Sequence, residues 1–94
     1  MSSVDTRSLL SGLEDYRKAL DRHLKKTNTE FRVMEQRWRA LNAVYTGDAA
    51  DEFRKHWAVT TARFQEYLTR SQRIASMLDE RIESLREYNR REGL

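Results

Sequence analysis

Apolar residues recur along the first half of the chain at alternating intervals of three and four residues. This spacing averages 3.5 residues, the repeat of a heptad stripe on one face of a helix. It predicts a first helix over about residues 6–44. With Arg17 and Thr27 admitted as two steps of the series, its members are Leu10, Leu13, Leu20, Leu24, Phe31, Met34, Trp38, Leu41 and Tyr45.

The second half carries the same spacing and predicts a second helix over about 48–88, followed by a tail at 89–94. Beyond residue 78 an irregular step shifts the stripe slightly around the helix. Two acid–base pairs at i,i+4 are expected to stabilise the helix on its outward-facing side: Asp51 with Lys55 and Glu87 with Arg91. The stripe itself is Ala50, Phe53, Trp57, Thr60, Phe64, Tyr67, Ser71, Ile74 and Leu78, then Ile82, Leu85 and Tyr88.

Between the halves, the stretch YTGDAA predicts a turn at 45–48. Gly47 can adopt the positive φ that ends a helix, and the Asp48 side chain can cap the start of the next one. A helix stop followed at once by a helix start folds the chain back on itself. The fold class expected is therefore all-α, a two-helix antiparallel hairpin forming one domain over 1–94.

The apolar stripe is wider than a single contact between two helices needs. A wide stripe indicates a second covered surface, so we expect two hairpins to dimerise into a four-helix bundle. The residues beside the stripe are Leu9, Tyr16, Val44, Val59, Ala62, Leu68, Ala75 and Met77. The residues expected to pack the hairpin or the dimer are Leu20, Leu24, Phe31, Met34, Trp38, Leu41, Phe53, Trp57, Phe64, Tyr67, Ile74 and Leu78.

Composition agrees with a small helical protein. The chain has 94 residues, no Pro, three Gly, no Cys and 35% charged residues, so neither a disulfide framework nor a turn-rich sheet is expected. No stretch approaches the ~20 apolar residues that cross a bilayer, and the first residues lack the apolar run of a signal peptide. We therefore expect no transmembrane segment and no cleavable signal.

Charge and motifs argue against catalysis and against nucleic acid. The net charge of +3 is spread among interspersed acids and bases, whereas a nucleic-acid patch needs segregated charge. The candidate nucleic-acid contacts are the arginines of the last segment, Arg81, Arg86, Arg90 and Arg91.

The chain also lacks a Gly-rich phosphate loop and a His-Glu-x-x-His motif. His23 and His56 are the only histidines, and His56 lies four residues after Glu52, a spacing that permits a weak ion pair. The aromatic residues follow the helical stripe, which favours packing over base stacking. We expect no enzyme activity, no metal, no cofactor and no small-molecule substrate.

The residues around the turn resemble those of a known family. Tyr45-Thr46-Gly47, then Asp48-Ala49-Ala50, then Phe53 and Trp57, resemble the turn of the WXG family of type VII secretion substrates, the early-secreted-antigen-like proteins. Tyr45 stands where that family has Trp. The resemblance implies a helical hairpin that pairs with a related hairpin, as a homodimer or a heterodimer.

A second motif extends the resemblance to the end of the chain. Tyr88-Asn89-Arg90-Arg91-Glu92 matches the YxxxE form of the family's export signal. The resemblance implies synthesis in a bacterial cytoplasm, secretion as a folded dimer, and recognition by a type VII secretion ATPase. In an antiparallel dimer, the turn of one chain would lie beside Tyr88 and Glu92 of its partner and complete a two-part signal.

Two other functions remain open at this level, and so does the kind of dimer. The same fold suits a coiled-coil interaction module that stays inside the cell, and the arginine-rich end leaves a nucleic-acid-binding helical protein as a third reading. Members of the family tend to be acidic, whereas this chain is basic. The excess of cations fits a chain that pairs with an acidic hairpin, and it is equally compatible with a homodimer.

Overall fold

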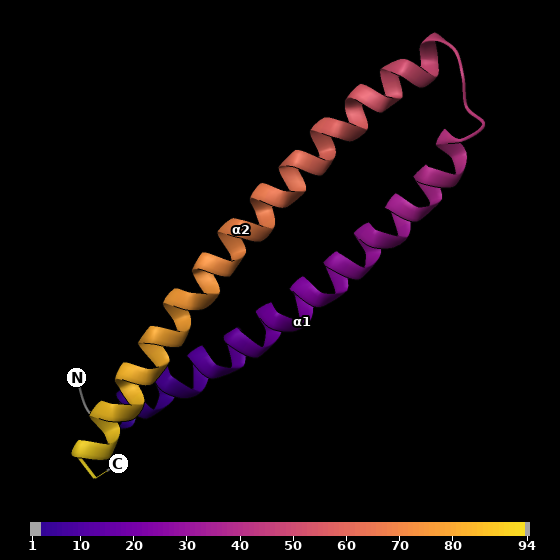
Figure 1. Cartoon of the computed structure of the whole chain (residues 1–94). Coiled ribbons are helices and arrows are strands. Elements are labelled where there is room, and N and C mark those ends of the chain that lie inside the picture. Colours follow the sequence, from indigo (N-terminus) through magenta and orange to yellow (C-terminus); the bar gives the residue numbers. More distant parts are fainter. Residues whose placement is uncertain (1–2, 94) are drawn as a thin grey trace. The chain divides into compact units, whose positions relative to one another are not determined.

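Two long helices make up the structure, a computed structural model that describes residues 3–93. Helix α1 is Ser3–Asn42 and α2 is Asp48–Arg91, joined by residues 43–47, and the described part contains no strand. The all-α hairpin predicted from the sequence is confirmed (Figure 1). Helix α1 ends two residues earlier than expected, and α2 continues three residues past Tyr88 into the segment expected to be a tail.

The contacts between α1 and α2 fall into two compact units. The turn unit is Leu24–Arg70, and the terminal unit comprises the described residues up to His23 together with those from Ser71 onward. Within each unit a segment of α1 lies beside a segment of α2 that runs in the opposite direction. Each unit has its own kind of contact surface.

In the terminal unit the helices meet through small and polar side chains. Ala75, Ile82 and Asn89 repeat every seven residues on α2 and are buried, as are Ser71 on α2 and Thr6 on α1. The sequence pattern places Ile74 in this contact, but its side chain is 48% exposed. The contact of α2 thus passes through Ala75 instead of Ile74 and through Asn89 instead of Tyr88, whereas Ser71 and Ile82 lie in it as the pattern predicts.

The turn unit is held by aromatic rings contributed alternately by the two helices. The ring of Phe31 stacks on that of Phe64 with centroids 4.1 Å apart, and on that of Trp57 at 5.5 Å. Trp38 lies 4.5 Å from Phe53 and 6.4 Å from Trp57. These five residues were expected to pack, and the structure brings their rings into contact, although none of them is fully buried.

Gly47 acts at the start of α2 rather than at the end of α1. Its φ is 103°, and its carbonyl accepts the first helical hydrogen bond of α2 from the Asp51 amide at 3.0 Å. Gly47 is therefore the N-cap, and Asp48 is the first helical residue instead of the cap. Asp48 and Asp51 both lie in the first turn, where carboxylates favour the positive end of the helix dipole.

Helix α1 ends without a glycine. The Tyr45 amide donates to the Leu41 carbonyl at 2.9 Å, and the Ala43 amide donates to the Arg39 carbonyl at 3.3 Å. These bonds satisfy two carbonyls of the last turn, so the helix stops at Asn42 without needing a positive φ there.

The buried Asn89 gives a first test of the terminal unit. Its side chain is 6% exposed, and its Oδ1 has no hydrogen-bond partner among residues 3–93. A buried acceptor without a partner costs about 1–3 kcal/mol, so Asn89→Leu should raise the free energy of unfolding by about 1 kcal/mol. Thermal unfolding followed by circular dichroism should show a melting temperature about 4–8 °C higher.

The matched control is Gln72→Leu, which removes an exposed side-chain amide from the same unit. It should leave the free energy of unfolding nearly unchanged. A loss of stability in Asn89→Leu would mean that the amide is satisfied in solution and that the prediction is wrong.

Candidate interaction surface

A groove lined by apolar side chains runs beside the helix contact in the terminal unit. It has a volume of about 710 Å³. Met77, which lines it, is 62% exposed, so no other described part of the chain covers the groove. We call it the terminal groove, and its lining is Thr6, Leu9, Leu13, Ile74, Met77, Leu78, Arg81, Ser84, Leu85 and Tyr88.

The turn unit leaves a comparable surface open, which we call the turn face: Met34, Leu41, Phe53 and Tyr67. All four side chains are exposed, Met34 by 54%. Each lies three residues after a residue of the helix contact, on α1 as on α2. Antiparallel helices that face each other present equivalent flanks on the same side, so these four residues share one face. They were expected to be packed, and in the single hairpin all four remain exposed, although the Phe53 ring contacts Trp38 and the Tyr67 ring lies 6.4 Å from that of Phe64.

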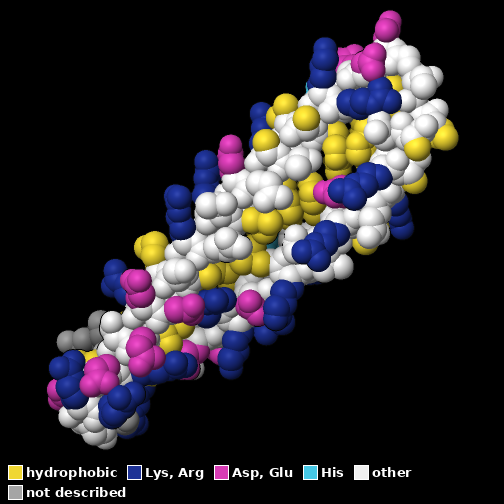
Figure 2. Space-filling model, viewed as in Figure 1, with side chains coloured by type: hydrophobic (Ala, Val, Ile, Leu, Met, Phe, Trp, Pro, Cys, Tyr) yellow, Lys and Arg dark blue, Asp and Glu magenta, His cyan; other side chains and the backbone are white. Residues whose placement is uncertain are grey.

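The two helices cover their apolar side chains only in part. Hydrophobic side chains remain visible between α1 and α2 in the turn unit, with Lys and Arg side chains along both flanks (Figure 2). The residues with large exposed apolar side chains include Leu9, Tyr16, Met34, Leu41, Val44, Phe53, Val59, Tyr67, Ile74, Met77 and Tyr88. Where these side chains gather beside the helix contact, in the terminal groove and on the turn face, they mark candidate interaction surfaces.

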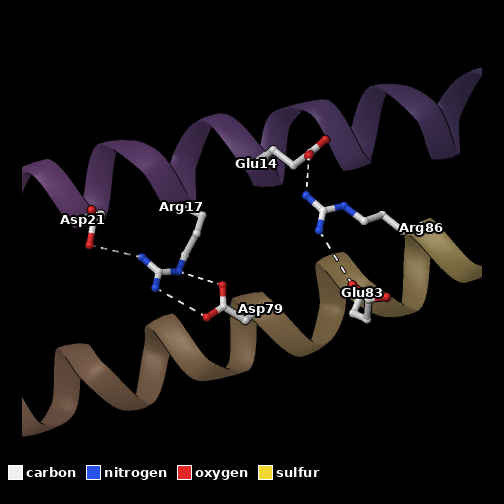
Figure 3. A network of polar contacts seen from close by, with 6 residues as sticks. All are labelled: Glu14, Arg17, Asp21, Asp79, Glu83 and Arg86. Atoms are coloured by element: carbon white, nitrogen blue, oxygen red, sulfur yellow. Dashed lines mark hydrogen bonds and ion pairs between the residues drawn. The ribbon is translucent and has the colours of Figure 1, made fainter.

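Two arginines bridge the helices of the terminal unit away from the groove. Arg17 Nε donates to Asp79 Oδ1 at 2.8 Å, and Arg86 Nη2 donates to Glu14 Oε2 at 2.8 Å (Figure 3). The hydrogen bond to Glu14 raises the pKa of Arg86 above its ordinary value. None of the bridging residues lines the terminal groove. The ion pairs therefore fix the register of the helices while leaving the groove accessible.

The four arginines that are candidate nucleic-acid contacts have different surroundings in the structure. Arg86 is paired with Glu14 and also approaches Glu83, and Arg90 Nη1 is 2.7 Å from Glu87 Oε2. Arg81 lines the terminal groove among apolar residues. The four do not form one basic patch, because acids lie between them.

Arg54 closes the turn, a role that the sequence did not reveal. Its Nε donates to Asn42 Oδ1 at 2.6 Å, its Nη2 donates to the Tyr45 carbonyl at 2.6 Å, and its Nη1 donates to Asp51 Oδ1 at 2.7 Å. One guanidinium thus joins the last residue of α1, the turn and the first turn of α2. The only available signal was a cation three residues after Asp51, which is common on helices.

Local ion pairs differ from those expected. Asp51 pairs with Arg54 and Glu87 with Arg90, both at i,i+3, instead of with Lys55 and Arg91 at i,i+4. For Asp51 the reason is the position of the Arg54 guanidinium over the turn. The other expected pair is present: His56 Nε2 lies 3.8 Å from Glu52 Oε1.

The two motif segments lie in different units of the chain. Tyr88 lines the terminal groove, and the Glu92 amide donates to the Tyr88 carbonyl at 3.0 Å, so the two residues sit one helical turn apart on the same side. Tyr45, Thr46 and Gly47 belong to the turn unit. Tyr45 is half-buried, whereas Thr46 and Gly47 are exposed.

Residues 3–93 contain no group of three His, Cys, Asp or Glu side chains arranged to hold a metal ion. Neither helix, over its described length, has an apolar stretch sufficient to cross a membrane. No protein-family model, no curated protein and no solved structure matches the chain.

Proposed function

We propose that this chain is a non-enzymatic helical hairpin that pairs with a second hairpin and is exported from a bacterial cytoplasm as a type VII secretion substrate. The pair is a four-helix bundle, formed with another copy or with a related chain. The carrying observation is that each unit leaves an apolar surface uncovered: the terminal groove, which Tyr88 lines, and the turn face. A second hairpin would cover these surfaces with the stripe that it also carries.

The placement of Tyr88 and Glu92 supports the export part of the proposal. Because α2 continues through Arg91, the two side chains are held one turn apart on an ordered helix end. Tyr88 is 40% exposed in the single hairpin, at the C-terminal end of the groove lining. A secretion ATPase that binds this end, together with Tyr45 and Gly47 of the partner chain, would accept only the assembled dimer.

Export of Tyr88→Ala tests the proposal. The tagged protein is expressed in its host, and culture supernatant is compared with cell pellet for wild type and variant. Wild type should be found outside and Tyr88→Ala should be retained, at equal total levels. Tyr16→Ala is the matched control, because it removes another exposed tyrosine from the same unit and should leave export unchanged.

The outcomes separate the two main functions. Retention of all three proteins at equal levels would reject export and favour an interaction module that stays inside the cell. Equal export of Tyr88→Ala and wild type would reject Tyr88 as the signal. Glu92→Ala then provides an independent check of the same motif, since its side chain is exposed and no described contact of the fold depends on it.

A further inference from the structure

The turn unit carries the whole excess positive charge of the chain. Residues 24–70 contain nine Lys or Arg and six Asp or Glu, a net charge of +3, whereas the remaining residues contain nine of each. Two of the six acids, Asp48 and Asp51, lie in the first turn of α2, and Glu52 follows directly. The rest of the turn unit is therefore strongly basic.

Part of this charge borders the turn face. Arg37 lies three residues after Met34 and four before Leu41, and Arg63 and Arg70 flank Tyr67 in the same way. Residues three or four apart are neighbours on a helix surface. Only one acid, Glu30, has an equivalent position beside a residue of the turn face.

These three arginines are not neutralised by the hairpin itself. All three are exposed, and none forms an ion pair within residues 3–93. By contrast, Arg39 and Arg54 of the same unit are bound to Glu35 and Asp51. An apolar face edged by unpaired cations needs a partner that supplies both an apolar stripe and carboxylates.

We propose that the turn face binds an acidic amphipathic helix of a second, different protein. The inference rests on the proposed function, because it names the partner that completes the hairpin. A second copy aligned turn face to turn face would bring its own Arg37, Arg63 and Arg70 to the same apolar residues, and like charges across an interface oppose association. A second copy aligned antiparallel would offer its terminal unit, whose nine cations and nine acids supply no net negative charge. An acidic helix with leucine-like side chains at helical spacing meets both requirements.

Nucleic acid fits the face less well. Two of its four residues, Met34 and Leu41, are aliphatic and offer bases no flat ring on which to stack. The rings of Phe31 and Phe64 already stack on each other at 4.1 Å. The face follows the spacing of a helix, which a partner helix matches.

Binding of synthetic helices to the purified full chain tests the proposal. One probe has leucine along one stripe with glutamate beside it, and the second has lysine in place of each glutamate. Fluorescence of Trp38, whose ring lies 4.5 Å from that of Phe53, and of the adjoining Trp57 reports binding. The glutamate probe should bind about tenfold more tightly than the lysine probe, and raising the salt from about 0.05 to 0.5 M should weaken its binding.

Charge reversal locates the site. The variant Arg37→Glu, Arg63→Glu, Arg70→Glu should reverse the preference between the probes. The control variant Lys26→Glu, Arg32→Glu, Lys55→Glu makes the same change in net charge in the same unit, away from the turn face, and should keep the wild-type preference. Circular dichroism verifies that both variants retain their helices.

Three results would overturn the proposal. They are equal affinity for both probes, no reversal in the Arg37/Arg63/Arg70 variant, or tight self-association of the wild type that the reversal leaves unchanged. Comparable binding of an oligothymidylate through the same arginines would assign the face to nucleic acid instead. The assay uses purified components, so its failure and a failure of export are independent of each other.

Discussion

Replacing Trp57 by alanine should lower the free energy of unfolding by about 2–3 kcal/mol. The Trp57 ring contacts both aromatic residues that α1 contributes to the turn unit, Phe31 at 5.5 Å and Trp38 at 6.4 Å. Its loss leaves a gap between them that the remaining rings cannot close. The expected loss is below that of a fully buried tryptophan, because Trp57 is half-buried.

Urea unfolding followed by circular dichroism measures this change, at a protein concentration where sedimentation shows a monomer. Val59→Ala is the control on the same helix, since its side chain is exposed, and it should shift stability by less than about 0.5 kcal/mol. Similar losses in both variants would show that the aromatic contacts do not hold the turn unit together.

The second large expected effect is a difference in stability between alanine variants at the helix contact of α2 and in its open groove. Ile82→Ala should cost about 2–4 kcal/mol in the monomer, because the side chain is 5% exposed at the helix contact. Ile74→Ala should cost about 1 kcal/mol or less, because its side chain lines the open terminal groove. The two variants delete the same atoms, so the comparison measures the environment alone.

A second measurement applies once a partner hairpin is available. Ile74→Ala should then weaken association, whereas Ile82→Ala should act on the fold of the hairpin. A larger loss of monomer stability in Ile74→Ala than in Ile82→Ala would place Ile74 in the helix contact, as the sequence pattern predicts. It would contradict the contact through Ala75 described above.

The helices and their hairpin could be predicted because they depend on periodic and local signals. A heptad stripe on each side of one short break specifies two helices and their antiparallel return. The burial of Ala75 and Asn89 in place of Ile74 and Tyr88 was not predictable from that stripe. Ile74 and Ala75 both lie within the apolar sector, and the spacing does not choose between them.

The turn and the candidate site were harder to predict for related reasons. A glycine next to an aspartate suits the end of one helix as well as the start of the next, and the hydrogen bond of Asp51 to Gly47 decides for the start. The contacts of Arg54 join Asn42, Tyr45 and Asp51, which become neighbours only after the chain has turned. The motif residues Tyr88 and Glu92 could be placed, but their function remains a prediction.

The contacts of the two units also differ in how much chain must be ordered before they form. The Arg54–Asn42 bond of the turn spans 12 residues of sequence, whereas the Arg86–Glu14 bond of the terminal unit spans 72. Closing the longer loop costs about 1.6 kcal/mol more in chain entropy. Folding should therefore begin beside the turn and extend along the helices. Refolding in which the amides near Glu14 gained hydrogen-exchange protection before those near Arg54 would contradict this order.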